Sequence, residues 1–229
     1  MHIRLLKHTP DPERVCAEAA RLCYNPVNID ELGQKLTPEQ VSATLKHVIK
    51  AGHLSVVEHA SFTFAIEGVS RALTHQLVRH RIASYSQQSQ RHVSGENFNY
   101  IIPPSVKANA ELKEKFERKM ADAAESYKEL ADAGVAKEDA RFVLPNACET
   151  KIVMTMNARS LLNFFELRCC TAAQWEIRAL ACEMLRMCKE TAPVIFENAG
   201  PTCVYRSYCG EGKRSCGRWK NIPKAFLKE

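Results

Sequence analysis

The 229 residues contain no run of about eighteen uncharged apolar side chains, the length that a helix needs to span a membrane. Near the N-terminus, Arg4 and Lys7 interrupt the apolar residues, so these do not form the core of a signal peptide. We therefore expect a soluble protein of the cytoplasm without a membrane partner. In that reducing compartment the ten cysteines are expected to be thiols or metal ligands rather than disulfides.

Several sequence motifs are also missing. No G-x-G-x-x-G or phosphate-loop pattern occurs, so a bound flavin or nucleotide must be held in another way. There is no H-E-x-x-H motif, acidic cluster or nucleophile elbow, and nothing therefore indicates a catalytic metal or a serine hydrolase. Internal repeats, Gly/Ser linkers and low-complexity blocks are absent, and the length suits one globular unit with a sizeable core.

The charges are distributed unevenly. Residues 203–229 hold seven of the 32 basic and two of the 26 acidic residues, which leaves 25 basic and 24 acidic residues in the first 202. A nearly neutral body argues against a nucleic-acid-binding protein, and only the basic tail favours one. The composition changes at about Gly200. We therefore expect one main domain over residues 1–200 and a Cys-rich, basic tail over residues 201–229.

Hydrophobic periodicity predicts a mixed α+β fold. We expect a single compact domain with a central, mainly antiparallel sheet and surrounding helices. Strands are expected at residues 3–6, 61–67 and 149–156, and helices at residues 11–24, 38–51, 70–81, 107–133, 137–143, 158–168 and 172–191. The first helix should bury Val15, Ala19 and Leu22. Thr37 begins a capping box, and Ser70 is expected to cap the helix that follows it.

Residues 79–91 are the most informative segment. They contain Arg79-His80-Arg81, Arg91 and six serine or glutamine side chains, with almost nothing apolar. Such a segment cannot be core, and a surface loop with so many donors predicts a polyanionic ligand such as a nucleotide phosphate, which arginine binds with its planar fork of N–H groups. Taken alone, such a triplet is usually a solvated surface or a partner of the dipole at a helix C-terminus, and the Ser/Gln/Arg run after it and Gln76 before it favour a functional role. Arg141 and Arg168 interrupt apolar segments, so each must be paired or must hold an anion.

The cysteines allow two interpretations. Cys203, Cys209 and Cys216 could bind zinc or an iron–sulfur centre with a fourth ligand that the sequence does not reveal, or they could be reduced structural thiols. We expect no metal, and these three are the candidates if one is bound. The remaining thiols on helical or strand segments are expected to be small buried hydrophobic groups; they are Cys16, Cys23, Cys148, Cys182 and Cys188.

Residues 79–91 also contain a motif that resembles one of a known family. Arg79-His80-Arg81, seven further residues and Ser89 resemble the signature of the flavin-dependent thymidylate synthases. The resemblance covers most of the chain and includes, in the family's order, Gly52-His53, Glu58-His59, Phe62-Thr63-Phe64, Gln76, Ala140-Arg141, Leu144-Pro145, Asn157-Ala158-Arg159-Ser160-Leu161, Asn163, Leu167-Arg168 and Ala173-Gln174-Trp175-Glu176.

The resemblance implies an enzyme that methylates dUMP reductively to dTMP. Methylenetetrahydrofolate would supply the carbon, NADPH the hydride, and FAD would carry the hydride between them. A homotetramer with shared active sites is expected. Residues 1–200 would be the catalytic domain, and no enzyme nucleophile would attack the pyrimidine.

The resemblance also implies roles for individual residues. Arg168 would lie at the uracil edge as the catalytic residue, where a fixed cation favours loss of the N3 proton and charge on the ring. His53 would lie on the folate and flavin side. The dUMP residues would be Gln76, Arg79, Gln87, Ser89, Gln90, Arg91, Arg141 and Arg168. The FAD residues would be Ser55, Arg79, His80, Arg81, Gln87, Asn157, Arg159 and Asn163. Without the resemblance, His53 could simply pack after Gly52, and Asn157 could be only a helix cap.

Two departures from the family pattern affect these expectations. Ser86-Gln87 stands where many relatives have Asn-Glu, which replaces a carboxylate acceptor with an amide that can both donate and accept. Cys170-Thr171-Ala172 stands where relatives often have Asp-Ser-His. Two rival functions remain: a nucleic-acid-binding module that uses residues 79–91 and the tail, and another flavoenzyme acting on uridine nucleotides or on uracil in RNA.

Overall fold

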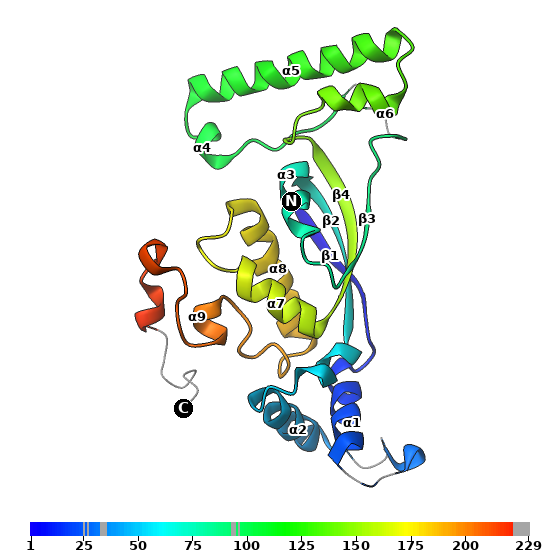
Figure 1. The fold of residues 1–229 in the computed structure, drawn as a ribbon, viewed down its shortest axis with the longest axis vertical. Coiled ribbons are helices and arrows are strands. Elements are labelled where there is room, and N and C mark those ends of the chain that lie inside the picture. The colour runs from blue at the N-terminus through cyan, green and yellow to red at the C-terminus, as the bar shows by residue number, and fades with distance from the viewer. Residues whose placement is uncertain (25, 27, 33–35, 93–94, 96, 222–229) are drawn as a thin grey trace. The chain divides into compact units, whose positions relative to one another are not determined.

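Four strands form one antiparallel sheet in the computed structural model, which describes residues 1–24, 26, 28–32, 36–92, 95 and 97–221 (Figure 1). The strands are β1 (His2–His8), β2 (Ser61–Ser70), β3 (Ser84–Gln87) and β4 (Glu149–Asn157). Their order in the sheet is β1-β2-β4-β3. Helices lie between the strands in sequence and surround the sheet, which confirms the expected α+β fold.

The α-helices are α1 (Pro12–Tyr24), α2 (Pro38–Lys50), α3 (Arg71–Leu77), α4 (Pro104–Lys107), α5 (Ala110–Asp132), α6 (Lys137–Ala140), α7 (Ala158–Arg168), α8 (Trp175–Thr191) and α9 (Thr202–Tyr205). Short 3₁₀ helices are η1 (Ile29–Glu31), η2 (Leu54–His59), η3 (Arg141–Val143), η4 (Gly212–Arg214) and η5 (Arg218–Asn221). The predicted tail therefore contains α9, η4 and η5; its residues 222–229 lie outside the described residues, and its boundary at residue 200 stays a prediction.

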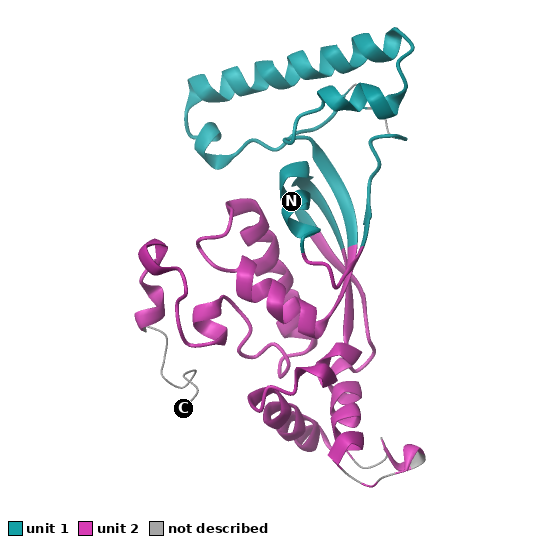
Figure 2. Ribbon diagram, viewed as in Figure 1, with its two compact units in different colours: residues 1–2, 65–79, 85–153 teal, residues 3–64, 80–84, 154–229 magenta. Residues whose placement is uncertain are grey.

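Tertiary contacts divide the chain into two compact units (Figure 2). Unit 1 comprises residues 1–2, 65–79 and 85–153, and unit 2 comprises residues 3–64, 80–84 and 154–229. In unit 1, Leu73 and Leu77 on α3 are fully buried, and a Cβ at Gly95 would come within 2.9 Å of Leu144 Cδ1, so the Leu144 side chain would have to shift. In unit 2, the ring of Phe196 packs edge-on against Phe62 and Phe165.

Local signals placed several helix starts correctly. The capping box is confirmed, because Gln40 N–H donates to the Thr37 hydroxyl and the Thr37 N–H donates to the Gln40 side chain. Behind it, α2 buries Val41, Leu45 and Val48 as expected. Ser70 caps α3 by accepting from the Leu73 N–H.

The buried face of α1 was predicted wrongly. The helix buries Pro12, Cys16, Ala17 and Ala20, whereas Leu22 is 51% exposed. Small side chains on this face allow α1 to pack closely against α2, and close packing is favoured over burying the largest apolar residues.

Three helix boundaries also differ from the expected ones. The helix expected over 70–81 ends at Leu77, so Arg79 and His80 lie beyond it. The helix expected over 107–133 begins at Ala110 as α5, because the Asn109 side chain caps it by accepting from the Leu112 N–H, and Lys107 is the last residue of α4. Helix α8 starts at Trp175 rather than residue 172, since the Gln174 side chain accepts from two of its first N–H groups.

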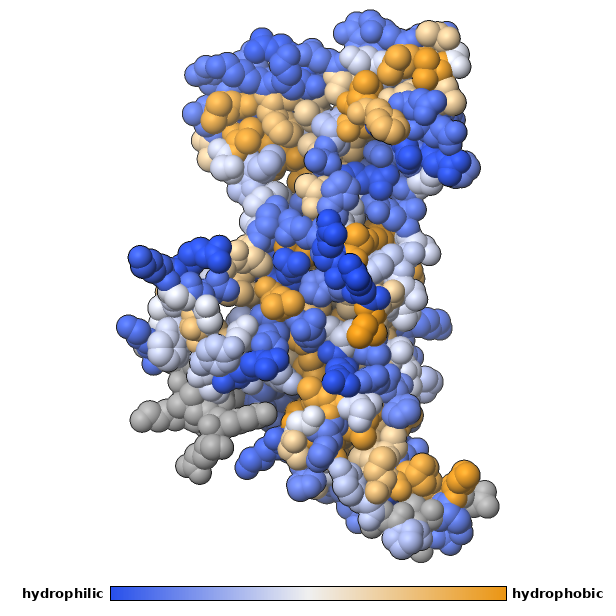
Figure 3. All heavy atoms as spheres, in the orientation of Figure 1, coloured by the Kyte–Doolittle hydropathy of each residue, from blue (hydrophilic) through white to orange (hydrophobic). Residues whose placement is uncertain are grey.

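Apolar side chains are exposed in unit 1, where Figure 3 shows apolar surface along α5 and around α6. They include Leu112, and Phe142 and Val143 of η3; Phe142 is 82% exposed. No helix in the described ranges is both long and apolar enough to cross a membrane.

Candidate functional site

The cationic segment begins directly after α3. The Tyr85 hydroxyl donates to the carbonyl of Leu77, the last residue of α3, at 2.9 Å. Burial raises the pKa of this phenol to about 12, so it remains a donor. The expected loop contains a strand, because residues 84–87 form β3 with Tyr85 and Gln87 half-buried and Ser84 and Ser86 exposed. The segment is thus held at the end of α3 and again in the sheet.

Seven of the eight residues predicted to bind dUMP belong to unit 1. They are Gln76 on α3, Arg79 after it, Gln87 on β3, Ser89, Gln90 and Arg91 after β3, and Arg141 at the start of η3. The eighth, Arg168, belongs to unit 2. Most of these side chains are half-buried, and Arg79 and Arg91 are exposed.

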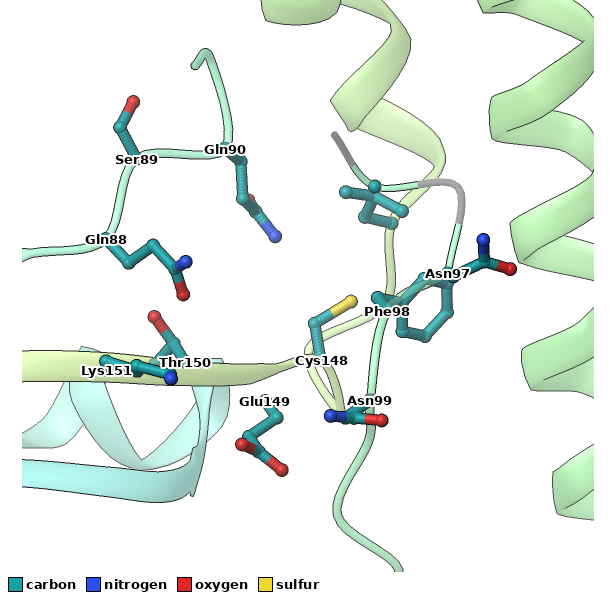
Figure 4. Close-up of a pocket in the computed structure, with 12 residues that line it drawn as sticks. Gln88, Ser89, Gln90, Asn97, Phe98, Asn99, Cys148, Glu149, Thr150 and Lys151 are labelled. Atoms are coloured by element: carbon teal, nitrogen blue, oxygen red, sulfur yellow. The ribbon is translucent and has the colours of Figure 1, made fainter. Parts of the chain in front are cut away.

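A pocket with a volume of about 200 Å³ lies between the segment after β3 and the start of β4 (Figure 4). Gln88, Ser89 and Gln90 line one side, and Cys148 and Thr150 line another. In Figure 4 the amides of Gln88 and Gln90 point toward β4, whereas the Ser89 hydroxyl points away from it. The lining is mixed, because Phe98 and Leu144 contribute apolar surface beside the amides of Gln88 and Gln90 and the charged Glu149 and Lys151.

The Ser89 hydroxyl has a structural partner. It accepts from the Arg91 N–H at 3.1 Å, which bends the chain after β3. In the described part of the chain, no histidine or carboxylate is hydrogen-bonded to this hydroxyl. Without a neighbouring base, Ser89 is not activated as a nucleophile.

Two arginines of the predicted dUMP set meet at one residue, Glu138 on α6. Arg91 Nη2 lies 2.8 Å from Glu138 Oε2, and Arg141 Nε donates to the Glu138 carbonyl at 3.0 Å. Both cations are thereby directed to one region of unit 1. An anionic ligand bound there would compete with the Glu138 carboxylate for Arg91.

In unit 2, Arg168 is the last residue of α7 and contacts His80. Its Nε donates to His80 Nε2 at 3.1 Å, and the imidazole packs edge-on against the Phe164 ring, with centroids 4.9 Å apart. Burial, with a smaller contribution from the Arg168 charge, lowers the pKa of His80 to about 4. The imidazole is therefore neutral near pH 7, with its proton on Nδ1, because Nε2 must accept.

The contact with His80 determines which edge of Arg168 is available. In the described parts of the chain, neither Nη1 nor Nη2 of Arg168 has a hydrogen-bond or ion-pair partner. Because Nε is occupied, the paired N–H groups of Nη1 and Nη2 form the edge that can bind an acceptor with two hydrogen bonds.

The remaining predicted FAD residues of unit 2 lie mainly on η2 and α7. Asn157 caps α7 by accepting from the Ser160 N–H at 2.9 Å, which confirms the predicted cap. Arg159 on α7 pairs with Glu58 on η2, which joins the two elements. The other predicted residues have exposed side chains; they are Ser55 on η2, Asn163 on α7, and Arg81 between α3 and β3. His53, at the start of η2, is also exposed, with its ring 6.2 Å from that of Tyr24.

All ten cysteines are free thiols. Cys16, Cys148 and Cys188 are buried as expected, whereas Cys23 and Cys182 are exposed, contrary to the prediction. Burial is the main cause of the raised pKa of Cys203 on α9, and the thiols of Cys170, Cys209 and Cys216 add to the effect. Cys170 is thus a neighbour of Cys203 that the spacing did not reveal.

No group of three His, Cys, Asp or Glu residues is arranged to hold a metal ion within the described ranges. Cys209 instead donates to the Ser215 hydroxyl at 3.3 Å. Metal analysis of the purified protein would separate a zinc centre from reduced thiols.

Comparison with known proteins adds independent evidence. The family model described as "Thymidylate synthase complementing protein" matches residues 4–194. The flavin-dependent thymidylate synthase of Geobacter sulfurreducens is 58% identical over 228 residues, covering 99% of this chain and 98% of the relative. Those of Clostridium tetani and Nitratidesulfovibrio vulgaris are 49% and 48% identical, covering 98% and 95% of this chain and 96% and 94% of the relatives. The chain therefore belongs to the flavin-dependent thymidylate synthase family.

Proposed function

We propose that this cytoplasmic enzyme converts dUMP to dTMP, with methylenetetrahydrofolate as carbon donor and NADPH as reductant. Family membership over nearly the full chain supports the reaction. The observation that carries the proposed mechanism is the Arg168 guanidinium, which the neutral His80 holds at Nε and whose Nη1 and Nη2 have no partner among the described residues.

Arg168 would stabilise negative charge on the uracil ring. A guanidinium is always charged, and its Nη edge matches a carbonyl oxygen and a deprotonated ring nitrogen side by side. Because His80 fixes Nε, the cation needs little reorientation as charge develops on the ring. Charge on the ring makes carbon 5 nucleophilic, so no enzyme nucleophile is required, in agreement with the hydrogen bonding of Ser89.

The dUMP phosphate would bind Arg91 and Arg141, the two cations that meet at Glu138. Gln76, Arg79, Ser89 and Gln90 would complete the site in unit 1. A phosphate monoester takes two arginines as well as hydroxyl and amide donors, and this set contains all three kinds of group.

The residues of unit 2 fit FAD by their chemistry. Arg81 and Arg159 supply positive charge for a pyrophosphate, and the exposed Ser55 and Asn163 supply polar groups for ribityl or ribose hydroxyls. When bound, FAD supplies two-electron hydride transfer between NADPH and the one-carbon unit. His53 is assigned to the folate and flavin side.

We further propose a homotetramer with shared active sites. Phe142 and Val143 are both exposed directly after α6, around which Figure 3 shows apolar surface, and exposed apolar patches mark protein–protein interfaces. Light scattering should give about four times the chain mass of 25.8 kDa. A monomeric mass in an active preparation would contradict shared sites.

The function is tested by measuring dTMP formed from dUMP, methylenetetrahydrofolate and NADPH at low oxygen, with and without FAD added to flavin-stripped protein. Flavin-dependent product formation would support the proposal. A yellow, folded protein without product would favour the flavoenzyme acting on uracil in RNA. Salt-sensitive binding of nucleic acid without flavin would favour the nucleic-acid-binding module.

The Glu138→Gln variant is expected to bind dUMP about two- to fivefold more tightly. In the unmodified protein, the phosphate must displace the Glu138 carboxylate from Arg91. Because this ion pair is half exposed, removing it lowers the free-energy cost of binding by about 1 kcal/mol or less. The hydrogen bond from Arg141 Nε to residue 138 is retained in this variant, because its acceptor is the backbone carbonyl. Isothermal titration calorimetry with dUMP measures the change.

The matched control is Glu111→Gln, which breaks an exposed ion pair with Lys115 on α5. Its dUMP affinity should equal that of the unmodified protein. Weaker binding of dUMP by Glu138→Gln would show that Glu138 orients Arg91 for the ligand rather than competing with it.

A further inference from the structure

The amide of Gln87 on β3 is held by two threonine hydroxyls of unit 1. Its Nε2 lies 3.0 Å from Thr74 Oγ1 on α3 and 3.3 Å from Thr150 Oγ1 on β4. Both threonines are almost fully buried, with exposures of 1% and 3%, while Gln87 is half-buried. Buried hydroxyls next to a half-buried amide form a small polar network whose polarity can be determined.

The Thr74 hydroxyl determines which way the amide faces. It donates its only hydrogen to the Arg71 carbonyl at 2.9 Å, so it can only accept from Gln87. The group beside it must therefore be the amide NH₂ and not the amide oxygen. A flipped amide would place two acceptors in contact, or would leave the Arg71 carbonyl without the Thr74 hydrogen.

Both N–H groups of the amide are thereby used inside unit 1. One is directed to Thr74 and one to Thr150, and Oε1 of this side chain has no hydrogen-bond partner among the residues that the structure describes. A glutamine in solution both donates and accepts, whereas this one can only accept. Toward a ligand, Gln87 therefore has the polarity of a carboxylate, without its charge.

We propose that Thr74 and Thr150 are positioning residues that make Gln87 an acceptor, and that this acceptor selects a nucleotide group that donates. The inference rests on the proposed function, in which dUMP is the ligand. On dUMP the available donors are the 3′-hydroxyl and the uracil N3–H. The 3′-hydroxyl is the better match, because an acceptor at N3–H would oppose the proton loss that Arg168 favours.

The inference is tested by dUMP binding to FAD-loaded Thr74→Val and Thr150→Val, measured by calorimetry. Valine keeps the shape of threonine and removes the hydroxyl, so the amide is free to turn. We expect dUMP to bind each variant about three- to tenfold more weakly, which corresponds to one neutral hydrogen bond. Thr74→Ser keeps a hydroxyl and should restore the affinity.

Two further variants separate positioning from general damage. Thr63→Val is the matched control, because Thr63 makes a similar threonine–threonine hydrogen bond with Thr155 in unit 2, and its dUMP affinity should not change. In Gln87→Leu there is no amide to orient, so adding Thr74→Val should cost no further affinity. Additive losses in this double variant would overturn the inference, because Thr74 would then act independently of Gln87.

Two ligand analogues identify the donor. If Gln87 accepts from the 3′-hydroxyl, the preference for dUMP over 2′,3′-dideoxyuridine monophosphate should disappear in Gln87→Leu and Thr74→Val. If Gln87 accepts from N3–H, the preference for dUMP over N3-methyl-dUMP should disappear in these variants instead. Either result supports the inference, and both preferences persisting would overturn it.

The outcomes also separate this inference from the proposed function. If the unmodified enzyme forms dTMP and Thr74→Val binds dUMP normally, only the inference fails. If the unmodified protein binds dUMP with the expected variant effects but forms no dTMP, only the proposed function fails. Loss of FAD from Thr74→Val with unchanged dUMP affinity would indicate that Gln87 accepts from FAD rather than from dUMP, and would overturn the inference.

Discussion

Replacing Arg168 by alanine is expected to reduce kcat by about 10² to 10³-fold and to change the dissociation constant of dUMP by less than about threefold. A loss of kcat of this size is typical when one hydrogen-bond donor that stabilises charge mainly in the transition state is removed. The substrate phosphate keeps its own arginines in unit 1, so binding in the ground state is largely preserved. Initial rates at saturating dUMP and calorimetry with dUMP measure the two quantities.

Arg168→Lys gives a more specific result. Lysine keeps the charge but has neither the Nε–H that His80 accepts nor the paired N–H groups of the outer edge. Turnover should stay well below that of the unmodified enzyme. Arg186→Ala is the matched control, because Arg186 forms exposed ion pairs with Glu183 and Glu190 on α8. Normal turnover of Arg168→Ala would refute the catalytic assignment.

Arg206→Ala is expected to lower the free energy of unfolding by about 2 kcal/mol and the melting temperature by about 4–8 °C. Arg206 follows α9 and donates Nε and Nη2 to the two carboxylate oxygens of Glu166 on α7, whose side chain is 9% exposed. Without Arg206, this carboxylate loses its ion-pair partner while largely buried. The value is below that of a fully buried pair because Arg206 is 56% exposed. Thermal unfolding followed by circular dichroism measures the loss.

Two variants test the cause of this loss. Combining Glu166→Gln with Arg206→Ala replaces the unpaired carboxylate by a neutral amide, so the double variant should melt above Arg206→Ala alone. Arg214→Ala should melt like the unmodified protein, because its contact with Glu211 is exposed and 3.9 Å long. If Arg206→Ala also melts like the unmodified protein, the pair does not hold α9 to α7.

The fold could be predicted where local chemistry determines it. The capping box at Thr37 and the caps at Ser70 and Asn157 depend on residues three positions apart, and all three are confirmed. The strand over β4 followed from the alternation of Ile152, Met154 and Met156, all of which are buried.

The predictions were wrong where tertiary contacts determine the end of a helix or its buried face. Helix α3 stops at Leu77, and the donor to its last carbonyl is Tyr85, eight residues away. The buried face of α1 depends on the small residues that α2 can approach, and hydrophobicity alone does not identify these.

The candidate site shows the same division. Its arginines, amides and hydroxyls could be named from the sequence, because an unusual density of donors in one segment is visible there. Their long-range partners could not: Glu138 lies 47 residues from Arg91, and Thr74 and Thr150 lie 13 and 63 residues from Gln87.

The low pKa of His80 also affects how the protein responds to acid. An unfolded chain takes up a proton on this histidine near pH 6.5, whereas the folded chain does so only near pH 4. Between these values the unfolded state binds more protons, so each step toward acid shifts the balance toward unfolding. The stability that His80 contributes is therefore complete above about pH 6.5 and falls as the pH drops toward 4. The contact that orients Arg168 thus makes mild acidification a destabilising condition for the whole enzyme.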